Sequence, residues 1–192
     1  IGEIIYLFHD DENGVPDELV RLFMGQPMDA HDEGNDVNEF LTNSDYALIV
    51  AFNFPAVVLT LGPKQWYRLR ELYKRLTTHA HNNVRNSLAA SLHQMAKIIG
   101  PKATCQDLIP VSDQFFRDTC VDVTATMLEH MDEFWLMLPM EAAREQLRRV
   151  PALWLTAYAH EWRLRQSLAT HVPALIPAML LTDEDGCLIT LL

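Results

Sequence analysis

The stretch VRNSLAASLHQMAKIIG, residues 84–100, decides the fold of this chain. Its large apolar residues follow steps of four, four, three and four, which place them on one face of an α-helix. The same steps recur in three other segments, and the four copies begin at Tyr46, Val84, Val123 and Leu164. Successive copies are 38, 39 and 41 residues apart, and a period near this length is typical of two-helix repeats.

Glycine and proline punctuate this repeat at consistent positions. The dipeptide Gly-Pro at 62–63 and at 100–101 closes two copies, because the glycine stops a helix and the proline cannot continue it. Pro110 and Pro151 each lie thirteen residues before the start of a copy. A proline inside a helix costs about 3 kcal/mol unless the bend is supported. The two prolines therefore predict a kink in the first helix of two repeats, although each could instead mark a helix start.

Each period has room for two helices and two turns. In the second pair, residues 66–76 predict the first helix and the polar stretch 79–83 predicts a tight turn. The third pair is expected to run from about residue 107 to 138, and the fourth from 140 to 181. A single pair cannot bury its apolar face, so neighbouring pairs must stack.

The predicted fold class is all-α: an α-solenoid, or armadillo-like superhelix, of about four HEAT-like helix pairs cut from a longer array. Residues 38–181 form this HEAT-repeat solenoid. Residues 1–37 are expected to be an acidic, partly disordered segment with a short helix near 15–24, because the stretch 25–37 has too little apolar surface to become ordered. Residues 182–192 are expected to form an irregular C-terminal stub.

The net charge of −11 is concentrated at the N-terminal end of the chain. Residues 1–45 hold twelve acidic residues and one basic residue, whereas residues 46–192 hold fourteen of each. The acidic segment is expected to be a solvated loop, although such a segment can also recruit a basic partner. Because no basic surplus exists anywhere, we predict that the protein does not bind nucleic acid.

Membrane insertion and disulfide bonding are also not expected. The most apolar run, residues 47–61, is shorter than a membrane span and is interrupted by Asn53 and Pro55. The cysteines share no CxxC spacing, so we expect buried free thiols in a reducing compartment. They are Cys105, Cys120 and Cys187.

No catalytic motif is present in the sequence. The patterns GxSxG, GxxxxGK[ST] and HExxH do not occur, so we predict no catalytic residue, no cofactor and no metal. His79 and His81 are too close in sequence to act as two ligands from one helical face, and we expect them in a surface turn. Three other histidines are expected to be structural: His93, His130 and His171. An acidic group is expected to form a solvated face rather than an acid–base pair: Glu129, Asp132 and Glu133.

The most informative polar residues lie in the turns and at the starts of the second helices. In a stack of repeats these positions align as a ridge, where partners commonly dock. We expect six residues to form this candidate protein-binding ridge: Asn83, Arg85, Asp122, Trp162, Arg163 and Arg165. Arg85 and Arg165 could instead form a hydrogen-bonded ladder between repeats. Trp162 resembles a binding anchor, although it could equally pack beneath the fourth turn.

Five stretches, together with Trp66, carry a resemblance to a known family: FPAVVLTLG (54–62), LRELYKRLT (69–77), VRNSLAASLHQMAKIIG (84–100), DLIP (107–110) and EWRLRQSLA (161–169). They resemble the family of protein phosphatase 4 regulatory subunit 1, over roughly residues 46–181. That family is itself similar to the scaffold subunit of protein phosphatase 2A. The shorter pieces are shared by both families, whereas the long run from Phe54 to Gly100 points to the type 4 subunit.

The resemblance implies a non-catalytic regulatory subunit. Such a subunit would bind a type 4 serine/threonine phosphatase catalytic subunit and direct its choice of substrates, in the cytoplasm and the nucleus. In the scaffold family, turn residues of a Trp-Arg-hydrophobic-Arg motif contact bound subunits, and Trp162, Arg163 and Arg165 match that motif. Thr124 departs from the arginine of the family pattern, which interrupts any ladder. Two alternatives remain: a HEAT-repeat adaptor in transport or complex assembly, and an enzyme whose site has no recognisable motif.

Overall fold

The computed structural model describes residues 2–8, 14–26 and 42–180, except for the side chains of 156, 157 and 176–180. This part of the chain is helical and contains no strand. Four helical segments carry the four apolar stripes. They are α4 (Ser44–Leu61), α6 (Asn82–Ile99), the pair α9 (Val121–Glu129) and α10 (Met131–Leu136), and α13 (Trp162–Leu180). The predicted all-α fold of helical repeats is confirmed.

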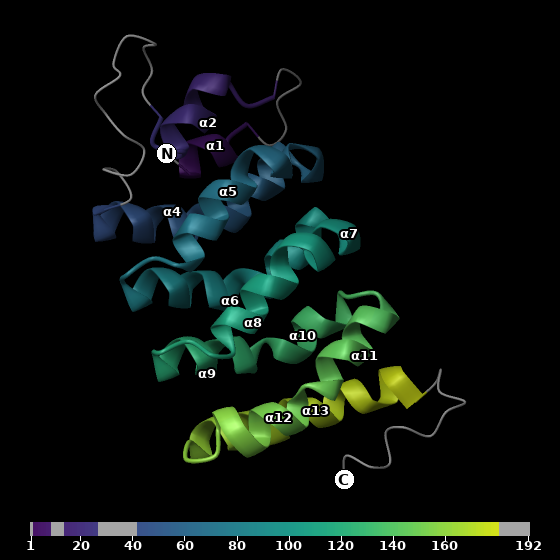
Figure 1. Cartoon of the computed structure of the whole chain (residues 1–192). Helices are drawn as coiled ribbons and strands as arrows, with labels where there is room; N and C mark the ends of the chain where they lie inside the picture. The colour runs from purple at the N-terminus through teal and green to yellow at the C-terminus, as the bar shows by residue number, and fades with distance from the viewer. Residues whose placement is uncertain (1, 9–13, 27–41, 181–192) are drawn as a thin grey trace.

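The second helices stack on one another in chain order. Helix α4 packs against α6, α6 packs against α9 and α10, and both of these pack against α13. Figure 1 shows the repeats arranged in this order, with α1 and α2 at one end and α13 at the other. Each pair therefore buries its apolar face against its neighbours, as the repeat pattern requires.

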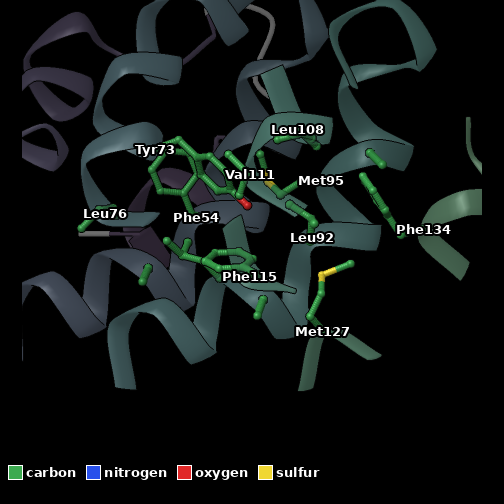
Figure 2. Packing of buried hydrophobic residues seen from close by; sticks show 14 of the residues in the cluster. Phe54, Tyr73, Leu76, Leu92, Met95, Leu108, Val111, Phe115, Met127 and Phe134 are labelled. Atoms are coloured by element: carbon green, nitrogen blue, oxygen red, sulfur yellow. The ribbon is translucent and has the colours of Figure 1, made fainter. Parts of the chain in front are cut away.

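The predicted stripes form one continuous core. All their described members are buried or packed against the buried cluster, and most have no exposed surface. Figure 2 shows several stripe residues, among them Phe54, Leu92, Met127 and Phe134, packed with residues of the first helices. Met179 lies outside the described side chains.

Two glycines end helices where the sequence predicts. Gly62 has φ +78° and Gly100 has φ +82°, a left-handed region that strongly favours glycine. Their N–H groups donate to the carbonyls of Val58 and Ala96, which caps α4 and α6. The proline after each glycine then occupies the first position of the next helical segment.

The first helices are less regular than the second helices. In the second pair, the short helix η1 (Pro63–Gln65) leads into α5 (Trp66–Thr77). In the third pair, α7 (Pro101–Ala103), the π-helical turn η2 (Thr104–Leu108) and α8 (Ile109–Phe115) follow without a break. In the fourth, α11 (Met140–Arg148), α12 (Val150–Ala152) and the π-helical turn η3 (Leu153–Ala157) follow in turn.

Pro110 and Pro151 both lie inside these helical runs, beside a π-helical turn. The N–H of Ile109 donates to the carbonyl of Thr104, and the N–H of Tyr158 donates to the carbonyl of Leu153, five residues back in each case. This wider turn absorbs the irregularity next to each proline. Pro110 is the second residue of α8 and Pro151 is the second residue of α12, so each lies near the start of a segment within a longer helical run. This position agrees with both alternatives and does not separate them.

Two boundaries differ from the sequence prediction. The first helix of the third pair begins at Pro101 rather than near Asp107, because the proline restarts a helix directly after Gly100. The second helix of that pair is broken at His130, whose φ of −116° and ψ of 12° end α9. The apolar stripe continues across the break, since Met127 and Met131 are both fully buried.

Polar contacts join the first helices of consecutive pairs. The Trp66 indole N–H donates to the buried Asp107 carboxylate at 2.8 Å, and Tyr158 donates its hydroxyl to the Phe116 carbonyl at 2.8 Å. Gln114 donates its amide N–H to the carbonyl of Thr77 at 2.6 Å. These contacts, two buried and one half-buried, fix the register of one pair on the next.

Two short helices pack against α4 at the N-terminal end of the stack. Helix α2 (Asp17–Phe23) corresponds to the predicted short helix, and α1 (Gly2–Tyr6) was not predicted. Phe23 meets Phe54 edge to face at 5.7 Å, and the Tyr46 hydroxyl donates to the carbonyl of Leu22 at 3.0 Å. Residues 27–37 and 182–192 lie outside the described residues, so the expectations for these two segments are not tested. The proposed boundaries at 37 and 181 stay predictions.

Helix α4 is longer than the apolar run suggested. It spans 18 residues with Pro55 inside it, and by length and composition it is the one candidate membrane span among the described helices. The expectation that this run is too short to span was therefore wrong. Core helices of folded domains pass the same test, and α4 packs against α1, α5 and α6. The absence of a membrane partner stays a prediction.

Candidate functional site

The turns that precede the second helices lie along one side of the stack (Figure 1). The turn between α5 and α6 contains His79 and His81, as expected, with their rings stacked at 5.6 Å. The corresponding turns of the third and fourth pairs lie before α9 and α13. The six predicted ridge residues all belong to these turns or to the helix starts that follow them.

Arg85 holds the second turn to the third pair. Its guanidinium donates two hydrogen bonds to Asp118, at 2.7 and 2.8 Å, and further bonds to the carbonyls of His79 and Ala80 at 2.6 and 3.0 Å. The exposed fraction is 11% for the Arg85 side chain and 5% for that of Asp118. The Arg85 guanidinium therefore joins the turn of its own pair to the turn of the next pair.

The electrostatics of this pair follow from its burial. Burial alone would raise the pKa of Asp118, but hydrogen bonds from Arg85 and from the N–H of Cys120 lower it below its usual range. The same ion pair raises the pKa of the Arg85 guanidinium above its ordinary value. Both groups are therefore charged at neutral pH, which is the state in which a buried bidentate pair is strongest.

The equivalent positions in the other two pairs also close turns, by different contacts. Thr124 is buried and its hydroxyl donates to the carbonyl of Phe115 at 3.0 Å, at the end of α8. The Arg165 guanidinium lies 4.4 Å from the centre of the Trp154 ring. Each of the three residues binds the end of the first helix or the turn of its own pair. Arg85 also ties its turn to the next pair through Asp118, as the ladder alternative expects, whereas the described contact of Arg165 stays within its own pair.

The remaining ridge residues are exposed. Asn83 and Asp122 lie at the starts of α6 and α9, with both side chains facing solvent. Trp162, the first residue of α13, is 66% exposed, and the exposed Arg163 lies 5.4 Å from the centre of its ring. Trp162 therefore does not pack beneath the fourth turn. The exposed subset of the predicted ridge is Asn83, Asp122, Trp162 and Arg163.

Cys120 adds a polarised thiol to the third turn. The Asn82 side chain donates to its sulfur at 3.3 Å, and this contact lowers the pKa of the thiol against the opposing effect of burial. Cys105 and Cys120 are free and half-buried rather than fully buried. Cys187 lies outside the described residues.

A second group of polar residues lies midway along the second helices. His93 from α6 and His130 at the helix break have stacked rings, with centroids 4.5 Å apart and an interplanar angle of 27°. Glu133 on α10 places one carboxylate oxygen 3.5 Å from His93 Nε2 and the other 3.9 Å from His130 Nδ1. Asp132 faces His171 on α13 at 3.3 Å.

This histidine cluster, defined as His93, His130 and Glu133, was not expected from the sequence. Burial lowers the pKa of His93, and the neighbouring His130 lowers it further. The Nδ1 atoms of both rings are buried and have no hydrogen-bond partner. The two rings are therefore only partly satisfied, which the sequence did not indicate. Among the acidic residues, Asp132 and Glu133 face histidines, whereas Glu129 is exposed.

Comparison with known proteins gives a consistent picture. The family model described as the protein phosphatase 4 regulatory subunit 1 middle domain matches residues 50–153. Serine/threonine-protein phosphatase 4 regulatory subunit 1 of Homo sapiens is 33% identical over 134 residues, and the protein of that name from Mus musculus matches equally. The alignment covers 70% of this chain and 14% of each relative, so the chain spans about one seventh of their length.

Proposed function

Because the chain belongs to the family of protein phosphatase 4 regulatory subunit 1, we propose that it is part of a non-catalytic regulatory subunit of a type 4 serine/threonine phosphatase. The family resemblance in the sequence is confirmed, and the names of the relatives, which are regulatory subunits, agree with a protein that is not an enzyme. In this proposal the subunit binds the phosphatase catalytic subunit and directs its choice of substrates, in the cytoplasm and the nucleus.

The stack of helix pairs supports a role in protein binding. Consecutive pairs repeat the same turn at regular intervals, so side chains at equivalent positions present a row of contacts to an extended partner. Because residues 46–192 carry equal numbers of acidic and basic residues, we do not propose nucleic acid as a partner. We propose no membrane partner either.

One observation supports placing the docking site at the fourth turn: Trp162 is 66% exposed and lies beside the exposed Arg163. Tryptophan and arginine are the residue types most enriched at binding hot spots. An exposed indole at the start of a helix, with a cation held near its face, can bury a large apolar area on binding without first unfolding the turn. We propose that Trp162 and Arg163 anchor the partner, with Asn83 and Asp122 at the edge of the contact.

The test is recovery of partners from cells by the full-length protein, compared with its Trp162→Ala, Arg163→Glu variant. We expect the native protein to recover a type 4 catalytic subunit and the variant to bind it at least about 30-fold more weakly, which corresponds to about 2 kcal/mol. The control variant is Tyr67→Ala, because Tyr67 is 64% exposed but lies on α5, away from the turns. Equal losses in both variants would contradict the proposed anchor.

The identities of the recovered proteins test the rest of the proposal. A native protein that recovers transport or assembly factors and no phosphatase would instead identify a HEAT-repeat adaptor. Hydrolysis of a phosphoester by the purified protein alone would contradict a non-catalytic role.

A further inference from the structure

The histidine cluster brings three metal-ligating side chains together from two consecutive repeats. His93 comes from α6, His130 from the break between α9 and α10, and Glu133 from the first turn of α10. One ligating atom from each residue lies within 4.8 Å of the other two. We propose that these three residues form a binding site for Zn²⁺, which joins the second and third repeats.

The ligand atoms lie close together, but the stacked rings must tilt for both nitrogens to face one ion. The two carboxylate oxygens of Glu133 face different rings, at 3.5 Å from His93 Nε2 and 3.9 Å from His130 Nδ1. Ligands held about 2.0–2.2 Å from a tetrahedral Zn²⁺ lie about 3.4 Å from one another. The His93–Glu133 separation is close to that value, whereas the His130–Glu133 separation exceeds it by about 0.5 Å, so binding requires a shift of the exposed Glu133 side chain.

A bound ion explains an otherwise unfavourable feature of the cluster. The Nδ1 atom of His130 is buried, faces Glu133 and makes no hydrogen bond. A buried polar atom without a partner costs about 1–3 kcal/mol, and an ion is one of the usual reasons for such an atom. Coordination by Zn²⁺ would satisfy this nitrogen and would neutralise the carboxylate beside it.

The chemistry of the set favours Zn²⁺ over the hard cations. Two imidazoles and one carboxylate are a known ligand set for Zn²⁺, whereas Mg²⁺ and Ca²⁺ prefer oxygen ligands alone. Glu133 is 59% exposed, so a fourth position remains open to water or to a donor atom of a partner.

A neighbouring pair provides a matched control. His171 and Asp132 face each other at 3.3 Å between α10 and α13, with 24% of each side chain exposed. This pair has the same chemistry and joins the next two repeats, but no third ligand is grouped with it among the described residues. His171→Gln therefore removes one histidine without removing a proposed ligand.

The experiment is a titration of the metal-free full-length protein with Zn²⁺, and with Co²⁺ as a spectroscopic substitute whose visible absorption reports tetrahedral ligands. We expect a site that saturates at one equivalent, is lost on adding a chelator, and raises the melting temperature with Zn²⁺ but not with Mg²⁺. Glu133→Gln and His93→Gln should each weaken Zn²⁺ binding by about tenfold or more, and His171→Gln should leave it unchanged.

Glu133→Gln is the decisive variant, because an exposed side chain on a short helix can be replaced without disturbing the core. Binding that is equally strong in this variant, or equally weak in His171→Gln, would overturn the site. Absence of a one-to-one complex in the native protein would overturn it as well. The experiment uses no phosphatase, so its outcome is independent of the proposed function.

Discussion

The turn before α6 and the turn before α13 occupy equivalent places in the repeat but use their side chains in opposite ways. In the former, Arg85 is almost fully buried and binds Asp118 of the next pair. In the latter, Trp162 and Arg163 contact each other and otherwise face solvent. The same position in a repeat can therefore hold the stack together or present a contact to a partner, and burial distinguishes the two.

The buried pair predicts the largest effect on stability. Replacing Asp118 with Ala leaves the Arg85 guanidinium buried without its counter-charge, and breaking such a pair costs about 3–5 kcal/mol. We expect the free energy of unfolding, measured with urea, to fall by about 3 kcal/mol. Asp122→Ala, which removes an exposed aspartate from the same turn, should have little effect. Similar losses in the two variants would show that the turn does not depend on the ion pair.

The same pair predicts how stability depends on pH. The pKa of Asp118 is lower in the folded protein than its ordinary value, so the native state favours the ionised carboxylate. This contribution is fully present above the unfolded pKa and is lost as the pH falls through the folded pKa. The loss of stability on acidification below about pH 4 should therefore be smaller in Asp118→Asn than in the native protein. Parallel pH profiles would contradict the assignment.

Thr124 predicts an intermediate effect, because it closes its turn with one neutral hydrogen bond. Thr124→Val keeps the shape of the side chain but leaves the buried carbonyl of Phe115 without this donor. We expect the free energy of unfolding to fall by about 1–2 kcal/mol. The control is Thr78→Val, because Thr78 is exposed at the end of α5. A fall as large as that of Asp118→Ala would mean that the neutral contact and the ion pair contribute equally.

The sequence predicted the core well because the apolar steps alone decide which residues face the stack. It did not predict the break at His130, since the apolar stripe continues through the break without a change of spacing. Nor did it predict α1, a helix of five residues that is stabilised by packing on α4 rather than by its own propensity.

The ridge was predicted as a set of positions, but its division into buried and exposed members required the tertiary contacts. Arg85 is buried because Asp118 lies opposite it in the next repeat, and nothing near Arg85 in the sequence indicates this. The histidine cluster was missed for the same reason, although a signal existed. His93 and Glu133 are 40 residues apart, close to one repeat, so they lie at the same level of adjacent helices.

Trp162 predicts the smallest effect on stability and the largest on binding. Because its side chain is 66% exposed, Trp162→Ala together with Arg163→Glu should change the free energy of unfolding by no more than about 0.5 kcal/mol, as for most surface substitutions. A buried support for the turn would instead lose about 3 kcal/mol or more. Urea unfolding and partner affinity, measured on the same variant, separate these outcomes. Weakened binding with unchanged stability would identify the fourth turn as a docking surface, in contrast to the second turn, which the Arg85–Asp118 pair holds in place. If neither quantity changes, the exposed indole has no role in this part of the chain, and the contrast between the two turns is one of burial alone.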